Sequence, residues 1–262
     1  MRALRGVTTK VVGSGGTVLD QLFRFAVRTL RARYRDQKIE LRTLRRHIRA
    51  GDIVCDVGAN KGSYLYWLAR WCGDGQLIVF EPQPSLARLL SEICATLRLR
   101  NVVVEPKAVS SVEGIQELFV PDGHQPGASL LCPSGTFTTV RVPTVTLDGY
   151  FGDTTPVAAL KIDVEGAELH VLKGAERLLR RCRPLIVVEC DDRQHLEGGI
   201  EEVFSYLRAL GYQGHFINGD KVLPIEKFDV HIHQRRDGEW FWKQPGYCHN
   251  FIFEAAALDQ QP

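Results

Sequence analysis

The stretch Asp-Val-Gly-Ala-Asn-Lys-Gly, residues 56–62, decides the fold. It follows an apolar run and opens a helical pattern. Its glycines, Gly58 and Gly62, let the backbone turn sharply and let a ligand approach without a Cβ in the way. The spacing is not the Gly-x-Gly-x-x-Gly of dinucleotide sites, and the loop lacks the Lys-Ser/Thr of phosphate loops. Two interpretations stay open, a loop for another kind of ligand or a tight strand-to-helix turn.

Outward from this loop, short apolar runs alternate with helical patterns. The runs that predict strands are residues 53–56, 76–81, 101–105, 157–163, 184–189, 212–217 and 249–254. The patterns that predict helices are residues 63–71, 84–99, 165–181 and 200–210. This alternation is typical of a parallel α/β sheet with helices on both faces. Ligands of such sheets bind beyond the carboxyl ends of the strands, where residues 56–62 should lie.

The segment 106–155 interrupts the alternation and is rich in Gly, Pro, Ser and Thr. Such a long connection inside a compact domain favours a functional loop. Two short extra strands are expected in it, at residues 116–120 and 137–142. The turn residues of 121–127 favour a mobile lid over the substrate.

The amino-terminal residues are strongly basic. Residues 1–49 hold 13 Lys or Arg against three Asp or Glu, a net +10, so the rest of the +2 chain carries −8. From residue 17 a helix is predicted whose apolar stripe is Leu19, Leu22, Phe23, Ala26 and Leu30, with Arg24, Arg28, Arg31 and Arg35 opposite. A second helix is predicted over residues 39–48. These helices either cap the main domain with their arginines in water or lie in a membrane interface; nucleic-acid binding is disfavoured because no recognised binding module accompanies them.

Acidic side chains end several of the predicted strands. Glu81 ends the second strand about twenty residues beyond the glycine loop, where a carboxylate can accept hydrogen bonds from the ribose of any adenosine-containing ligand. Asp163 ends the fourth strand, and Glu189 ends the fifth. Glu165 and Glu168 are expected in the first helical turn after Asp163, where capping would also explain them. Carboxylates this close should raise at least one pKa, which suits proton transfer near neutral pH.

The chain resembles the FkbM family of methyltransferases over roughly residues 50–255. The residues that carry the resemblance are Asp56-Val57-Gly58-Ala59-Asn60 with Gly62, Phe80-Glu81-Pro82, and Lys161-Ile162-Asp163-Val164-Glu165-Gly166-Ala167-Glu168 followed by Leu172, Gly174 and Ala175. The run from Lys161 to Glu168 is the most specific part. Residues 1–49 lie outside the resemblance.

The resemblance implies a class I methyltransferase fold, a Rossmann-like, mostly parallel sheet of seven strands with the last strand antiparallel. It implies S-adenosylmethionine as the cofactor and O-methylation of a sugar, glycolipid or secondary metabolite. By similarity, Asp56, Gly58, Asn60 and Gly62 would line the methionine part, Glu81 would hold the ribose, Lys107 or Ala108 would flank the adenine, and Asp163 would sit at the transfer site.

A mechanism follows as a hypothesis. Asp163 or Glu165 accepts the proton of the acceptor hydroxyl, and Glu189 orients the acceptor. In a metal-dependent variant Asp163 and Glu189 would hold Mg²⁺. The rival functions are an NAD-dependent oxidoreductase, which Glu81 alone would permit, and a non-catalytic membrane-associated scaffold.

The domain prediction is a lead-in (1–16), a basic helical extension (17–49), the methyltransferase domain (50–256) and a tail (257–262). The amino terminus lacks an apolar signal core, and no stretch reaches the roughly 18 apolar residues of a membrane span, so a cytoplasmic protein is expected. The expected partner is a small-molecule, glycoside or glycolipid acceptor, with peripheral membrane contact through residues 17–49 as the alternative role of the extension. Seven scattered cysteines without a Cys-x-x-Cys spacing argue against a disulfide framework and a zinc knuckle.

Overall fold

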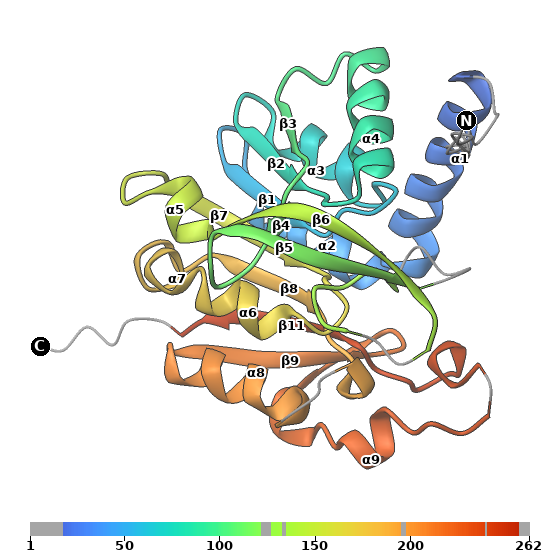
Figure 1. Cartoon of the computed structure of the whole chain (residues 1–262). Coiled ribbons are helices and arrows are strands. Elements are labelled where there is room, and N and C mark those ends of the chain that lie inside the picture. Colours follow the sequence, from blue (N-terminus) through green and yellow to red (C-terminus); the bar gives the residue numbers. More distant parts are fainter. Residues whose placement is uncertain (1–17, 122–126, 133–134, 195–197, 239, 257–262) are drawn as a thin grey trace, which may run out of the picture.

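The computed structural model describes residues 18–121, 127–132, 135–194, 198–238 and 240–256 (Figure 1). The predicted lead-in of residues 1–16 and tail of residues 257–262 lie outside the described residues. So does most of the predicted lid, residues 122–126.

An eight-stranded sheet forms the centre of the described chain, in the order β10-β9-β11-β8-β7-β1-β2-β3. Its strands are β1 (Ile53–Val57), β2 (Gln76–Phe80), β3 (Val102–Glu105), β7 (Val157–Ile162), β8 (Leu185–Glu189), β9 (Tyr212–Asn218), β10 (Lys221–Pro224) and β11 (Asn250–Ala255). Neighbours from β3 to β8 are parallel, whereas the last strand, β11, lies antiparallel between β8 and β9. The predicted class I fold is thus confirmed, and β10 adds an antiparallel edge strand to the seven expected.

Helices cover both faces of this sheet (Figure 1). On one face α1 (Val18–Arg31), α2 (Lys38–His47), α3 (Leu65–Cys72) and α4 (Pro84–Thr96) share a core with the sheet. On the other face lie α5 (Leu147–Phe151), α6 (Glu168–Lys173), α7 (Glu176–Cys182) and α8 (Gly199–Ala209). The central strands are buried almost throughout, as parallel strands between two helical layers must be.

The middle segment forms a second, three-stranded sheet in the order β4-β6-β5. Its strands are β4 (Ala108–Val109), β5 (Gly114–Pro121) and β6 (Phe137–Val145). The two extra strands predicted at residues 116–120 and 137–142 are therefore confirmed as parts of β5 and β6, which pair antiparallel. This sheet lies at the end of the central sheet where β1 and β7 finish.

The predicted helix over residues 165–181 is wrong in its extent. The chain turns through Glu165 and Gly166, both with positive φ (55° and 99°), before α6 begins, and α7 follows as a separate helix. Glu168 closes this turn, because its Oε1 accepts hydrogen bonds from the Gly166 and Val164 amides. Glu165 is thus freed from the helix and stands in a loop next to Asp163.

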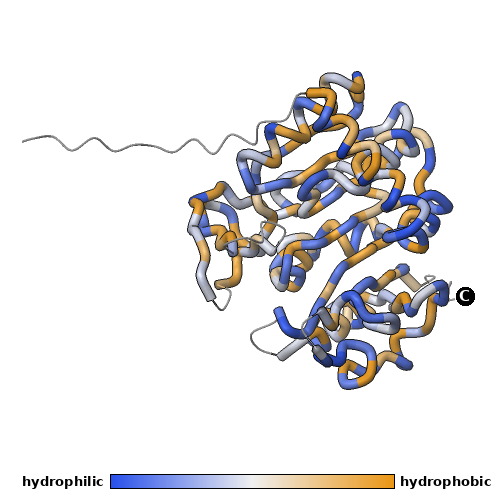
Figure 2. The backbone as a smooth tube through the Cα atoms, turned by 90° about the vertical axis from the view of Figure 1, so that its right-hand side faces the viewer, coloured by the Kyte–Doolittle hydropathy of each residue, from blue (hydrophilic) through white to orange (hydrophobic). Residues whose placement is uncertain are grey.

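The amino-terminal extension begins with α1, continues through a π-helical turn η1 (Ala32–Asp36) and ends with α2. Both predicted helices exist, but of the stripe predicted for the first only Leu22 packs against the core. Instead Phe25, Thr29 and Ala32 are buried, while Leu19, Phe23 and Leu30 are 78%, 69% and 51% exposed. Figure 2 turns this side of the molecule toward the viewer and shows its apolar and polar segments. Among the described residues, no helix is long and apolar enough to cross a lipid bilayer.

Candidate functional site

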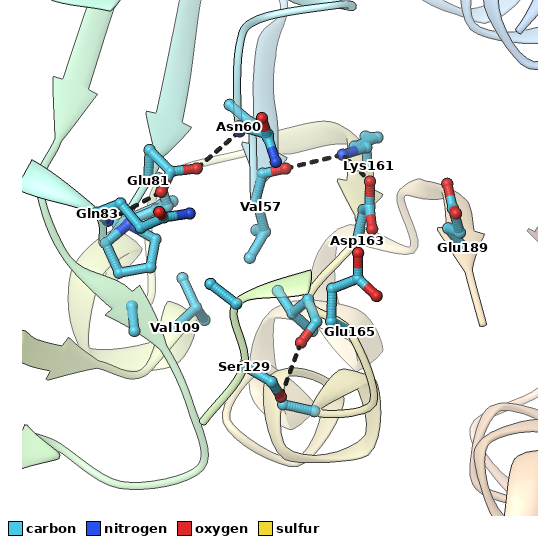
Figure 3. Close-up of a pocket in the computed structure, with 18 of the residues that line it drawn as sticks. Val57, Asn60, Glu81, Gln83, Val109, Ser129, Lys161, Asp163, Glu165 and Glu189 are labelled. Atoms are coloured by element: carbon cyan, nitrogen blue, oxygen red, sulfur yellow. Dashed lines mark hydrogen bonds and ion pairs between the residues drawn. The ribbon is translucent and has the colours of Figure 1, made fainter. Parts of the chain in front are cut away.

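A pocket lies at the carboxyl ends of the strands, where the strand order reverses between β1 and β7. This is the place where open α/β sheets bind ligands. Figure 3 shows Glu81 on one side of the pocket and Lys161, Asp163 and Glu165 on the other. The side chains come from the ends of four strands and from the second sheet, so residues more than 100 positions apart meet here.

The glycine loop forms one wall of the pocket. Gly58 has φ 76°, and its amide donates a hydrogen bond to the Phe80 carbonyl over 2.9 Å. A Cβ at Gly58 would overlap the Asp163 carbonyl oxygen, because the loop crosses directly over the end of β7. The sequence therefore needs glycine here to bring β1 and β7 together, whatever else the loop binds.

Glu81 fastens the end of β2 to the glycine loop. Its Oε2 accepts a hydrogen bond from the Asn60 amide over 2.7 Å, and its Oε1 accepts one from the Gln83 amide over 2.9 Å. Burial raises the pKa of the Glu81 carboxyl to about 7, although these two bonds oppose the shift. Each carboxylate oxygen has two lone pairs, so both oxygens retain capacity for a ligand hydroxyl.

Lys161 lines the pocket and is almost fully buried. Its Nζ donates to the Gly58 carbonyl (3.1 Å) and to Asp163 Oδ2 (3.3 Å), and lies 3.5 Å from Asp56 Oδ1. Burial lowers the pKa of Lys161, but Asp163 and Asp56 outweigh burial and hold the pKa above its ordinary value. A permanently charged lysine thus fixes Asp163 beside the glycine loop.

Two further acids face the pocket next to Asp163. Burial, reinforced by Asp163 and Glu168, raises the pKa of Glu165 to about 8, and the Gln194 side-chain amide donates a hydrogen bond to its carboxylate. Glu189 lines the pocket with 41% of its side chain exposed, and its Oε1 lies 3.8 Å from His249 Nε2. Burial and then Asp163 raise the pKa of Glu189 well above its usual value. The pocket therefore holds acids able to bind or release a proton near neutral pH.

The opposite end of the pocket is more apolar. Phe80, Val109 and Ala108 line it, together with Leu118 and Leu130 from the second sheet and its loop. Lys107 also lines it and pairs with Glu105 over 2.8 Å. The Glu81 and Lys107 amides both donate hydrogen bonds to the Glu105 carbonyl, which brings Lys107 close to Glu81. Val109, which follows Ala108 in β4, lies on the Glu81 side of the pocket, away from Asp163 and Glu189 (Figure 3).

Most of the predicted site residues line this one pocket. These are Gly58, Asn60, Glu81, Lys107, Ala108, Asp163, Glu165 and Glu189. The exceptions are Asp56 and Gly62. Asp56 points to the opposite face of β1 from Val57, is buried, and accepts no hydrogen bond from the described residues. Gly62 lies under α1, where an added Cβ would meet Leu90 and Phe25.

The sequence reasoning missed several lining residues. Arg28 and Gln37 reach the pocket from the amino-terminal extension. Tyr64, which directly precedes α3, and Ser129, which lies between β5 and β6, also line it. The Ser129 hydroxyl donates to the Val164 carbonyl over 3.4 Å. Arg28 shares the polar face of its predicted helix with Arg24, Arg31 and Arg35, so the sequence pattern does not single it out.

No group of three or more His, Cys, Asp or Glu side chains in the described chain is arranged to hold a metal ion. The Asp163 and Glu189 pair suggested for Mg²⁺ thus gains no third ligand of these types among those residues. Asp163 is instead paired with Lys161.

Comparisons with known proteins identify the family of this chain. The family model for the methyltransferase FkbM domain matches residues 56–213. Methyltransferase FkbM from Methylobacillus flagellatus shares 13% identity with the chain, over 90% of this chain and 58% of its own length, with a TM-score of 0.49. The chain therefore spans little more than half of that protein.

Two further solved structures are similar. A candidate rRNA methylase from Clostridium thermocellum shares 12% identity over 84% of this chain and 96% of its own, with a TM-score of 0.50. A SAM-dependent O-methyltransferase from Thermotoga maritima shares 14% identity over 87% and 67%, with a TM-score of 0.46. A search of curated proteins found no match.

The family match is decisive because of what it includes. It spans more than half of the chain and contains the glycine loop, Glu81 and the turn from Asp163 to Glu168, which are the residues that build the pocket. The chain belongs to the family of methyltransferases with an FkbM domain.

Proposed function

We propose that the protein is an S-adenosylmethionine-dependent methyltransferase that acts on a hydroxyl oxygen. The observation that carries the proposal is one pocket with a ribose-type carboxylate, Glu81, at one end and a cluster of pocket acids at the other. The fit to the cofactor rests on the same residues. Glu81 would hold the ribose hydroxyls, Lys107 and Ala108 would flank the adenine, and the loop from Gly58 to Asn60 would line the methionine part.

In the same assignment Arg28 would bind the carboxylate of the cofactor's methionine part. It lines the pocket beside the glycine loop, because Phe25, one turn earlier in α1, packs against Gly62. No carboxylate within ion-pairing distance of Arg28 occurs among the described residues, and burial lowers its pKa. Lys161 is already paired with Asp163 and Asp56, and Lys107 is paired with Glu105. Arg28 is thus a pocket cation with capacity for a ligand carboxylate.

The acid cluster supplies the proton chemistry. When bound, the cofactor supplies an activated methyl group, so the enzyme has to position the acceptor and remove its proton. Glu165 has a pKa of about 8 and stands beside Asp163, which Lys161 fixes in place. We assign Glu165 as the proton acceptor, Asp163 as the carboxylate beside the transfer site and Glu189 as the group that orients the acceptor hydroxyl. The acceptor class, a small molecule, glycoside or glycolipid, belongs to the same proposal.

The test uses labelled S-adenosylmethionine with glycoside and lipid extracts. We expect labelled product from the wild-type protein and at least about a hundredfold slower transfer by Glu165→Gln, with unchanged affinity for S-adenosylhomocysteine. A base must be deprotonated to act, so transfer should rise with pH through about pH 8 in the wild type. Transfer by Glu165→Gln at the wild-type rate would remove Glu165 from this role. A labelled amine or carbon in the product would overturn the assignment to oxygen.

A further inference from the structure

The amino-terminal helix presents a row of large apolar side chains to solvent. Twelve large hydrophobic residues are exposed in the described chain, and six of them fall between Val18 and Tyr34. Four of these six lie on one side of α1: Leu19, Phe23, Val27 and Leu30, here called the α1 stripe. Their exposed fractions range from 39% for Val27 to 78% for Leu19. Such a concentration marks an interaction surface rather than scattered surface residues.

The α1 stripe is separate from the face that holds the helix on the domain. The stripe residues follow one another at intervals of three or four, the spacing of a single helix face. Phe25, Thr29 and Ala32 follow the same spacing on another face and are buried. Trp67 donates a hydrogen bond to the Thr29 carbonyl over 2.8 Å on that buried side. One apolar face therefore packs the helix against the domain, and the α1 stripe forms a second apolar face that is exposed.

Charge indicates what covers the α1 stripe. Residues 18–36 hold five arginines and two aspartates. Arg24 and Arg31 pair with Asp20 and Asp36 but remain 75% and 56% exposed, and at helical spacing they border the stripe. Beyond them α2 exposes Arg42, Arg45 and Arg46. Apolar side chains bordered by arginines match a bilayer with anionic headgroups, where the stripe enters the acyl boundary and the arginines reach the phosphates.

We infer that the α1 stripe docks the protein on the surface of an anionic lipid bilayer. The same helix lines the pocket through Arg28, on the side away from the stripe. Docking through the stripe would hold the pocket wall about 10 Å, one helix diameter, from the lipid surface. The inference concerns binding alone and needs neither cofactor nor acceptor, so it stands or falls apart from the proposed activity.

The experiment measures how the full chain partitions onto sedimenting vesicles made of equal parts of phosphatidylcholine and phosphatidylglycerol. The test variant is Leu19→Ser/Phe23→Ser/Leu30→Ser. Its matched control, Val112→Ser/Ile115→Ser/Ile232→Ser, removes three equally exposed apolar side chains elsewhere. All six positions are more than half exposed, so both variants should fold, which circular dichroism checks.

We expect the wild type and the control to bind these vesicles alike and the stripe variant to bind at least about tenfold more weakly. Binding should also fall with added salt and on vesicles of pure phosphatidylcholine. Equal binding by the stripe variant and the wild type would overturn the inference. So would a wild type that ignores the vesicles, or one that forms a dimer that the stripe substitutions dissociate, because the stripe would then be covered by protein.

Discussion

The helices α1 and α2 come from one basic extension, yet they use their apolar residues in opposite ways. In α2 the apolar residues Leu41 and Leu44 are buried against α3 and the sheet, and Ile39 is buried as well. In α1 the larger apolar residues face solvent, and a narrower face with Phe25 holds the helix in place. A hydrophobic pattern therefore identifies a helix and its faces, but the neighbours decide which face becomes core. The unused face of α1 is free for another task.

The largest expected effect is on stability in α2. Leu44→Ala removes a fully buried side chain, so we expect it to lower the free energy of unfolding by about 2 to 5 kcal/mol. Phe23→Ala removes a larger but exposed side chain of α1 and should change the free energy of unfolding by less than about 0.5 kcal/mol. Urea unfolding of both variants measures the contrast. A loss for Phe23→Ala as large as that for Leu44→Ala would mean that the stripe is packed in the native protein.

The next effect concerns the buried acid of α2. Burial raises the pKa of Glu40 to about 7 from an ordinary 4.5. A raised carboxyl pKa means that the native state favours the proton, so its contribution to stability is complete below pH 4.5 and is lost as pH rises through about 7. Glu40→Gln cannot ionise. It should gain stability relative to the wild type, by up to about 3 kcal/mol, between about pH 5 and about pH 8.

The control for this gain is Glu92→Gln on α4, which makes the same substitution at an exposed position. Urea unfolding at several pH values measures both variants. A stability difference between Glu40→Gln and wild type that stays constant over this range would show that Glu40 ionises freely in the folded protein.

The smallest expected effect is on ligand affinity, and it compares an arginine on the pocket side of α1 with one on its solvent side. Arg28→Met keeps an unbranched apolar side chain and removes the guanidinium charge, so binding of S-adenosylhomocysteine should weaken about tenfold. Adenosine, which has no carboxylate, should bind unchanged. Arg24→Met, an exposed arginine of the same helix, should leave both affinities unchanged. Equal losses for adenosine and S-adenosylhomocysteine would contradict the carboxylate assignment.

Much of the fold and the pocket could be predicted because the deciding signals are local. Apolar runs such as Val157–Ile162 predict strands, and the residues that end them, Glu81 and Asp163, must meet at one sheet edge. The position of Glu165 was harder. Helical spacing continued through Gly166, but that glycine takes a positive φ and delays the helix until Glu168.

What could not be predicted depends on contacts between distant parts of the chain. Arg28 lies more than twenty residues before the family match and reaches the pocket only because Phe25 packs over Gly62. Asp56 looked like a lining residue by its place in the loop motif. It is buried behind Lys161, whose Nζ lies 3.5 Å from Asp56 Oδ1 and which lines the pocket in its place.

The most direct test of the central claim is calorimetric titration of the protein with S-adenosylhomocysteine and, separately, with NAD. If Glu81 and the acids beyond β7 frame one site for an adenosyl sulfonium, S-adenosylhomocysteine binds the wild type at one site and at least about tenfold more weakly to Glu81→Gln, while NAD gives no heat. Heat with NAD and none with S-adenosylhomocysteine would contradict the account.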